Sequence, residues 1–163
     1  MLAPSLVVVD TSAAIELLVA DAPSRREYVA LFAHLRASDC EIAYSELLEV
    51  ELLEAAFTWD VRRERRLDWR KARRDGTLQR TRRLEQTILR DWDAFLGGVP
   101  AHRYGTHSFL DDAARVMDVT GLGSNDAVHL ALARSLEVPI VTHDRPMIRA
   151  ADAWPGALSV RSR

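Results

Sequence analysis

The chain is poor in the residues that stabilise secreted domains or anchor proteins in membranes. It has one cysteine, Cys40, among 163 residues. No disulfide can therefore form within the chain, and a reducing compartment suits such a protein. The apolar run near the amino terminus ends at Asp10 after about five residues, too short for a signal-peptide core or a membrane span. We expect a soluble, cytoplasmic protein with no membrane partner.

Signatures of several common sites are also missing. No Cys/His cluster has the spacing of zinc ligands, and no glycine-rich loop of the nucleotide-binding kind is present. A haloacid-dehalogenase-like site needs a second aspartate two residues after the first, where Ser12 stands. A receiver domain needs a lysine near a late strand, whereas Lys71 is the only lysine. Phosphoaspartyl chemistry is therefore disfavoured.

Composition and patterning predict the fold. With 48 % hydrophobic and 28 % charged residues, the chain suits one globular domain, which we expect to span residues 1–163. Alternating short apolar runs and amphipathic stretches predict a three-layer α/β/α fold with a parallel sheet of four to five short strands. The expected strands are residues 5–9, 41–43, 140–142 and 158–160, and the expected helices are 12–19, 24–37, 45–75, 77–96, 108–119, 126–136 and 145–152.

A basic segment interrupts this alternation, and we predict a helical insert, a basic hairpin, within residues 55–105. Residues 61–90 hold 12 Lys and Arg against 4 Asp and Glu, a net charge of +8, while the rest of the chain carries −10. One helical stripe has an arginine at every fourth position: Arg62, Arg66, Arg70 and Arg74. Like charges at this spacing destabilise a helix by roughly 0.2–0.5 kcal/mol per pair. The stripe therefore favours an external polyanion or an acidic partner protein, unless the arginines only solvate the hairpin.

Three aspartates occupy positions where an α/β fold places functional groups. Asp10 follows the first apolar strand, Asp144 follows the strand at 140–142, and Asp126 begins an apolar helix. Open parallel sheets bind ligands outside the carboxyl ends of their strands. Carboxylates that meet there repel each other unless a cation joins them, and hard divalent ions prefer oxygen ligands. The pattern predicts a metal-dependent site acting on phosphate esters, although each aspartate alone can also be a helix cap.

A fourth acid is not determined by spacing. Glu46, Glu49, Glu51 and Glu54 share a helix whose apolar residues surround it almost completely, so helical periodicity does not choose among them. Hydroxyl and amide groups beside the aspartates can hold a water or a phosphate oxygen, or can simply cap helices. These groups belong to Thr11, Ser12, Asn125 and Thr142.

Two histidines flank the acids. His129 stands three residues after Asp126 and, near carboxylates, could titrate close to neutral pH. A packed histidine with no chemical function is the more frequent outcome, and we expect His143 to be solvated.

Four stretches together resemble the PIN domain, and they are especially similar to the VapC-type ribonuclease toxins. They are residues 7–12 (VVVDTS), 45–53 (SELLEVELL), 126–133 (DAVHLALA) and 141–145 (VTHDR). The resemblance covers about residues 5–54 and 107–160. The third and fourth stretches are fairly specific when they occur together, whereas Asp-Thr-Ser alone is weak. The insert is longer and more basic than in compact members of the family.

The resemblance implies a site and an activity. It implies metal-binding catalytic acids at Asp10, Glu51, Asp126 and Asp144, and a catalytic hydroxyl at Thr11 or Ser12. The implied cofactor is Mg²⁺ or Mn²⁺, and the implied activity is hydrolysis of RNA to a 3′-hydroxyl and a 5′-phosphate. Type II toxins also imply a cognate antitoxin protein and a homodimer. On this reading, the arginine stripe of the insert would bind the RNA.

Two other functions stay open. A PIN scaffold can bind RNA or a partner protein without catalysis, and a DNA-directed nuclease would share the same acids. Because no acid of the expected set is missing, we favour an enzyme. Which RNA is cut, whether an antitoxin exists and whether one or two metal ions bind are not determined by the sequence.

Overall fold

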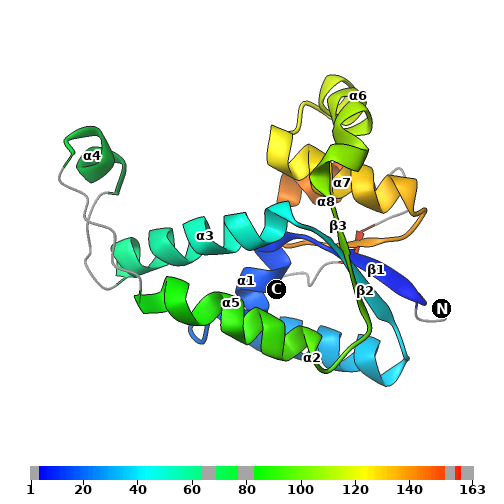
Figure 1. Ribbon diagram of the computed structural model, residues 1–163, viewed down its shortest axis with the longest axis horizontal. Helices are drawn as coiled ribbons and strands as arrows, with labels where there is room; N and C mark the ends of the chain where they lie inside the picture. The colour runs from blue at the N-terminus through cyan, green and yellow to red at the C-terminus, as the bar shows by residue number, and fades with distance from the viewer. Residues whose placement is uncertain (1–3, 64–68, 77–82, 153–156, 159–163) are drawn as a thin grey trace.

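The computed structural model describes residues 4–63, 69–76, 83–152 and 157–158 (Figure 1). Five strands and the helices alternate along the chain. The elements are β1 Leu6–Val9, α1 Thr11–Leu18, α2 Arg25–Ala37, β2 Glu41–Ser45, α3 Leu47–Arg63, α4 Trp69–Arg74, α5 Arg83–Leu96, β3 Ala101–Tyr104, the short 3-10 helix η1 Thr106–Phe109, α6 Leu110–Thr120, α7 Ser124–Ser135, β4 Ile140–Val141, α8 Arg145–Ala151 and β5 Ala157–Leu158.

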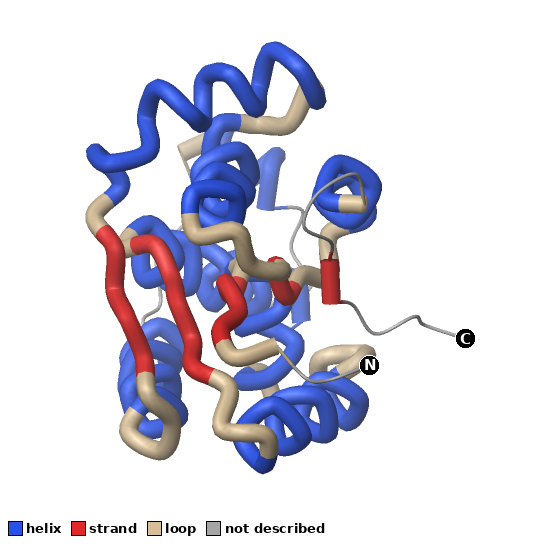
Figure 2. Tube along the Cα trace, turned by 90° about the vertical axis from the view of Figure 1, so that its right-hand side faces the viewer, coloured by secondary structure: helices blue, strands red, loops and turns tan. Residues whose placement is uncertain are grey.

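One parallel sheet organises the molecule. Its strand order is β3-β2-β1-β4-β5, and every neighbouring pair is parallel. Figure 2 shows the strands lying side by side. The predicted fold class is confirmed. Because β1 is the central strand, its carboxyl end lies directly beside that of β4, where Val9 pairs with Val141.

Helices cover both faces of the sheet, which makes three layers (Figure 1). Alternate residues of a strand point to opposite faces. Val7 and Val9 pack against α1, α2, α3 and α5 on one face, whereas Val8 packs against α6, α7 and α8 on the other. All three valines are fully buried. A strand buried on both faces is a continuous apolar run rather than an alternating one, and the sequence of β1 has this pattern.

The basic insert starts from a helix that also belongs to the core. Helices α3 and α5 pack along each other, and α4 lies at the far end of the pair (Figure 1). Ile88 and Trp92 of α5 are 1 % exposed and join the core cluster on this face of the sheet. The predicted helix stop at Gly76 agrees with the end of α4 at Arg74 and with the positive φ of 66° at Gly76.

The predicted insert at 55–105 was wrong in one respect. Residues 101–104 form β3, which pairs with β2 from Ala101 to Tyr104 and is an edge of the sheet. Its sequence is short and polar, and its first three residues are exposed, so it lacks the apolar run that marked the other strands. Pairing with β2 rather than side-chain burial makes this segment a strand.

Several predicted boundaries and caps also differ. Both Asp10 and Ser12 were candidates to cap α1; Asp10 is the cap and accepts a hydrogen bond from the Ser12 backbone N–H at 3.2 Å. Ser24 precedes α2 without a capping bond from its side chain. Ser45 does cap α3, since its Oγ accepts from the Leu47 N–H at 3.1 Å. Helix α7 begins at Ser124, two residues before Asp126.

Parts of three predicted elements lie outside the described residues. They are positions 64–68 of the predicted helix 45–75, positions 77–82 of the next predicted helix and positions 159–160 of the last predicted strand. None of the helices in the described part of the chain is long and apolar enough to cross a membrane.

The end of α7 generates a stability prediction. Glu137 has a φ of 54°, and its left-handed conformation lets the N–H of Val138 reach the carbonyl of Ala133 at 3.0 Å. This conformation is unfavourable for a residue with a Cβ and is ordinary for glycine. We expect Glu137→Gly to raise the free energy of unfolding by about 0.5–1 kcal/mol in urea denaturation. Glu137→Ala keeps the Cβ and should give no comparable gain, so equal effects of the two substitutions would contradict this account.

Candidate active site

The carboxyl ends of β1 and β4 are joined by a network around Asp10. The Asp10 carboxylate is 3 % exposed, and its Oδ2 accepts hydrogen bonds from the hydroxyl groups of Ser12 and Thr142, the latter at 2.8 Å. Buried carboxylates are tolerated when several donors bind them. The two hydroxyls also lie 3.2 Å apart. Ser12 and Thr142 therefore link the two strands through the Asp10 carboxylate.

Asp144 follows β4 and caps α8. Its Oδ1 accepts the Met147 backbone N–H at 2.8 Å, and its own N–H donates to the Thr142 hydroxyl oxygen at 3.0 Å. Asp10 and Asp144 are thus both helix caps. They are also neighbours at one edge of the sheet, because the Asp10 N–H donates to the Val141 carbonyl at 3.0 Å.

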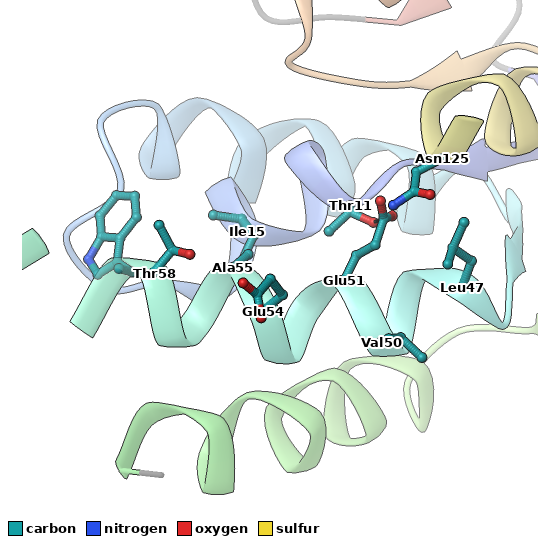
Figure 3. Close-up of a pocket in the computed structure, with 10 residues that line it drawn as sticks. Thr11, Ile15, Leu47, Val50, Glu51, Glu54, Ala55, Thr58 and Asn125 are labelled. Carbon is teal, nitrogen blue, oxygen red and sulfur yellow. Dashed lines mark hydrogen bonds between the residues drawn. The ribbon is translucent and has the colours of Figure 1, made fainter. Parts of the chain in front are cut away.

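Glu51 reaches this edge from α3. Its Oε2 lies 2.7 Å from His129 Nε2 and 2.5 Å from the Thr11 hydroxyl, which donates to it. Figure 3 shows Thr11, Glu51 and Asn125 lying together. Burial acts to raise the pKa of Glu51, but the hydrogen bonds from His129, Thr11 and Asn125 and the charge of His129 outweigh burial and lower it. Glu51 is therefore held as a carboxylate.

The neighbouring glutamates have other partners. Glu49 forms a bidentate pair with Arg103, at 2.9 and 3.0 Å, and Glu46 accepts the Thr106 backbone N–H at 3.1 Å. Glu54 is exposed and lines the pocket along α3. Glu51 is thus the glutamate of this segment that faces the aspartates, a choice that helical periodicity alone left open.

His129 is fully buried beneath the acids. Its Nε2 lies 4.0 Å from Asp10 Oδ1 and 3.5 Å from the Thr11 hydroxyl, in addition to its contact with Glu51. Burial lowers the pKa of His129, but the hydrogen bond to Glu51 and the charges of Asp10, Glu51 and Asp126 raise it further than burial lowers it. A protonated His129 would compensate part of the negative charge, so this histidine is both packed and electrostatically coupled to the acids.

Asp126 carries the clearest electrostatic signal. Its pKa is raised from 3.8 to about 6, first by burial and then by the negative charges of Asp10, Asp144 and Glu51. His129 opposes this shift. Asp126 therefore lies close enough to the other three carboxylates to be repelled by each of them, as was expected for acids gathered at the carboxyl edge of a sheet.

The donor set suits a hard divalent cation, because carboxylate oxygens are the ligands that Mg²⁺ and Mn²⁺ prefer. Within the described residues, no group of three or more His, Cys, Asp or Glu side chains already forms a metal site. Local hydrogen bonds explain this arrangement: Asp10 Oδ2 is bound by two hydroxyls, and Glu51 Oε2 is bound by His129 and Thr11. The residues fit a cation in chemistry, and some of them would have to turn toward it.

A pocket of about 790 Å³ opens beside the acids. It runs along α3 from Thr11, Glu51 and Asn125 toward Thr58 (Figure 3). Its remaining lining is largely apolar and includes Ile15, Leu47, Val50 and Trp59. Trp59 packs against the core cluster, and its Nε1 donates to Asp21 Oδ1 at 3.0 Å. Glu51, Thr11 and Asn125 thus lie at one end of an apolar trough.

The arginine stripe is only partly described. Arg66 and the side chain of Arg62 lie outside the described residues. Arg70 and Arg74 are exposed on α4, and Arg74 contacts Asp75 at 3.4 Å. Since α4 lies at the far end of the α3–α5 pair (Figure 1), these arginines are not part of the acidic site.

Sequence reasoning missed two buried residues next to the site. Glu16 Oε1 lies 3.8 Å from His143 Nε2, and the Tyr28 ring meets the His143 ring edge-on at 5.6 Å. His143, expected to be solvated, is therefore only partly exposed. Glu16 stands in an apolar helix, and Tyr28 looked like an ordinary core residue of α2. The only sequence feature that could have indicated these residues is that Glu16, an acid, stands among apolar neighbours.

The fold and site define an α/β/α domain with an acidic centre at the carboxyl edge of a parallel sheet. The family model of the PIN domain matches residues 7–153. The chain therefore belongs to the PIN domain family. No curated protein sequence matches it.

Solved structures with a similar fold include two that contain bound DNA. VapBC2 from Rickettsia felis bound to a promoter DNA fragment has a TM-score of 0.58 and 14 % identity, covering 95 % of this chain and 97 % of that one. PAE2754 from Pyrobaculum aerophilum has a TM-score of 0.57 and 23 % identity, with coverage of 97 % and 85 %. FitAB bound to the IR36 DNA fragment has a TM-score of 0.57 and 14 % identity, with 94 % of each chain covered. At these identities the likeness shows the fold alone.

The raised pKa of Asp126 predicts a stability change. Because the folded protein holds a proton on Asp126 more tightly than the unfolded chain, stability falls as pH rises from about 4 to about 6. The full shift corresponds to about 3 kcal/mol, which solvent screening of a partly exposed group reduces to about 1 kcal/mol. We expect Asp126→Asn to raise the melting temperature of metal-free protein by about 2–4 °C at pH 7.

Calorimetry in the presence of a chelator measures this effect, and the gain should disappear at pH 4. Asp118→Asn, which changes an exposed aspartate on α6, is the matched control and should have no effect at either pH. A loss of stability in Asp126→Asn at pH 7 would argue against repulsion among the four carboxylates.

Proposed function

We propose that this protein is a metal-dependent endoribonuclease of the VapC type, the toxin of a type II toxin–antitoxin pair. The observation that carries this proposal is the pKa of Asp126, raised to about 6 partly by Asp10, Asp144 and Glu51. The stability of the fold alone does not explain why four acids from distant segments lie at one edge of a sheet. A site that binds a cation during function does give such a reason.

The acids would hold Mg²⁺ or Mn²⁺ through Asp10, Glu51, Asp126 and Asp144. When bound, such a cation polarises a phosphodiester and lowers the pKa of a coordinated water. The surrounding residues act on the acids. The Thr11 hydroxyl and His129 orient Glu51, and the apolar trough begins beside Glu51.

The assignment as a toxin is supported by the fold shared with VapBC2 and FitAB, whose structures are complexes. We propose a cognate antitoxin as a partner, together with a homodimer and a cytoplasmic location. RNA is the proposed substrate because the basic insert places exposed arginines on α4, where they can contact phosphates beyond the site of cleavage.

A non-catalytic PIN scaffold is the second candidate. It is favoured by the absence of a ready-made metal group among the described residues. A scaffold would bind RNA or a partner protein without consuming it. A DNA-directed nuclease would share the acids of the first candidate, so the choice of substrate must separate the two.

Removal of a proposed ligand provides the first test. We expect Asp10→Asn and Asp144→Asn each to lower Mn²⁺-dependent cleavage of a single-stranded RNA by at least about 100-fold, measured with a labelled oligonucleotide on folded protein. The Asp118→Asn protein should cleave RNA like the unmodified protein, and a chelator should stop cleavage by these two proteins. A parallel DNA oligonucleotide should stay intact. Full metal-dependent cleavage by both variants would refute the proposed site, and cleavage of DNA alone would refute the substrate.

The basic insert provides a second, independent test. In the non-cleaving Asp10→Asn protein, we expect Arg70→Gln with Arg74→Gln to weaken RNA binding and to lower the slope of log K against log salt concentration by about 1. Fluorescence anisotropy at several salt concentrations measures both quantities. Arg149→Gln, at an exposed position on α8, is the control. An unchanged affinity and slope in the double variant would leave the arginines without a function in RNA binding.

A further inference from the structure

The segment Thr142–Asp144 between β4 and α8 forms hydrogen bonds with residues other than the four acids. Its central peptide group joins the carbonyl of Thr142 to the N–H of His143. The N–H donates to the Ser12 hydroxyl at 2.8 Å, and the carbonyl accepts the Tyr28 hydroxyl at 2.8 Å. Two hydroxyls, one from α1 and one from α2, therefore hold the same peptide plane from its two sides.

This peptide plane controls the direction of two side chains in the site. On one side stands Thr142, whose hydroxyl donates to Asp10 Oδ2 at 2.8 Å. Two residues further along the chain stands Asp144, whose N–H returns to the Thr142 hydroxyl at 3.0 Å. Rotation of the peptide would move Thr142, whose Cα belongs to this peptide unit. It would also disturb Asp144, whose backbone N–H is bound to the Thr142 hydroxyl.

Tyr28 is itself rigidly placed. It is fully buried, and its ring contacts the ring of His143 edge-on. Its backbone N–H donates to the Ser24 carbonyl at 3.0 Å, and the Ser24 N–H donates to the buried Glu16 Oε2 at 2.7 Å. The carboxylate of Glu16 thus fixes the start of α2, and α2 fixes Tyr28.

We infer that Tyr28 is a positioning residue, which sets the geometry of Asp144 and Thr142 through its hydrogen bond to the Thr142 carbonyl. The inference rests on the proposed metal-dependent function, because it assigns Tyr28 an effect on cation binding. A buried tyrosine whose only function was to fill the core would not need a hydrogen bond to this particular peptide group. Outer residues that orient metal-binding side chains typically change metal affinity by 10- to 100-fold when they are altered.

Tyr28→Phe tests the inference, because it keeps the buried ring and removes only the hydroxyl. The matched control is Tyr44→Phe, at another buried tyrosine, which packs against Trp92 and has its hydroxyl near Glu49 instead of the acids. Mn²⁺ affinity of the full chain is measured by calorimetric titration. We expect about a 10-fold weaker affinity in Tyr28→Phe and an unchanged affinity in Tyr44→Phe, although both changes can lower the stability of the metal-free protein.

Two further readouts separate positioning from general destabilisation. Amide hydrogen exchange of His143 should accelerate in Tyr28→Phe and not in Tyr44→Phe, which tests the hold on the peptide without metal or substrate. In RNA cleavage, Tyr28→Phe should raise the Mn²⁺ concentration for half-maximal rate about 10-fold, with a smaller change in the rate at saturating Mn²⁺.

The outcomes are distinguishable. Faster exchange at His143 with an unchanged Mn²⁺ affinity would overturn the inference and leave the proposed function standing. An equal loss of Mn²⁺ affinity in Tyr28→Phe and Tyr44→Phe would also overturn it, since a general loss of stability would then explain the weaker binding. If the unmodified protein neither binds Mn²⁺ nor cleaves RNA, the proposed function fails, and the inference fails with it.

Discussion

Mutual repulsion of carboxylates at the carboxyl edge of the sheet is the constraint on which the rest of this structure depends. Asp126 shows it most directly, because the charges of its three acidic neighbours contribute to a pKa of about 6. The surrounding residues reduce the cost in different ways. Hydroxyls bind Asp10, while the buried His129 compensates Glu51. Such compensation is partial, so the raised pKa of Asp126 persists.

The scaffold makes this crowding possible through its central strand. Because β1 is buried on both faces, it is held by two core clusters at once, and its last residue has little freedom to move. Parallel pairing with β4 then brings Thr142 beside Asp10. A rigid sheet edge with short helix caps places polar groups more accurately than a long loop would. The hold of Tyr28 on the Thr142 carbonyl extends this rigidity into the segment after β4.

Helix α3 connects the acidic site to the basic insert. It carries Glu51 near its start, and its partner α5 anchors the insert to the core through Ile88 and Trp92. The helix that supplies an acid to the site therefore also leads toward α4 and its arginines (Figure 1). An acid near the start of α3 and exposed arginines on α4, beyond its other end, suit the proposed long anionic ligand, which would contact the insert while one of its phosphates reaches the acids.

Local sequence determined the parts whose signal is carried by neighbouring residues: the apolar run of β1, the acid that follows it, and the parallel α/β/α class. It did not determine β3, whose polar residues become a strand only by pairing with β2. Helical periodicity did not choose Glu51 from its neighbours, and only the resemblance to the PIN domain did so. In the structure, Glu51 is distinguished by its contact with His129, 78 residues away. Tyr28 gained its partner only when α2 packed beside β4. Periodicity records which face of an element is buried, whereas the partner buried against it is decided by how distant elements pack.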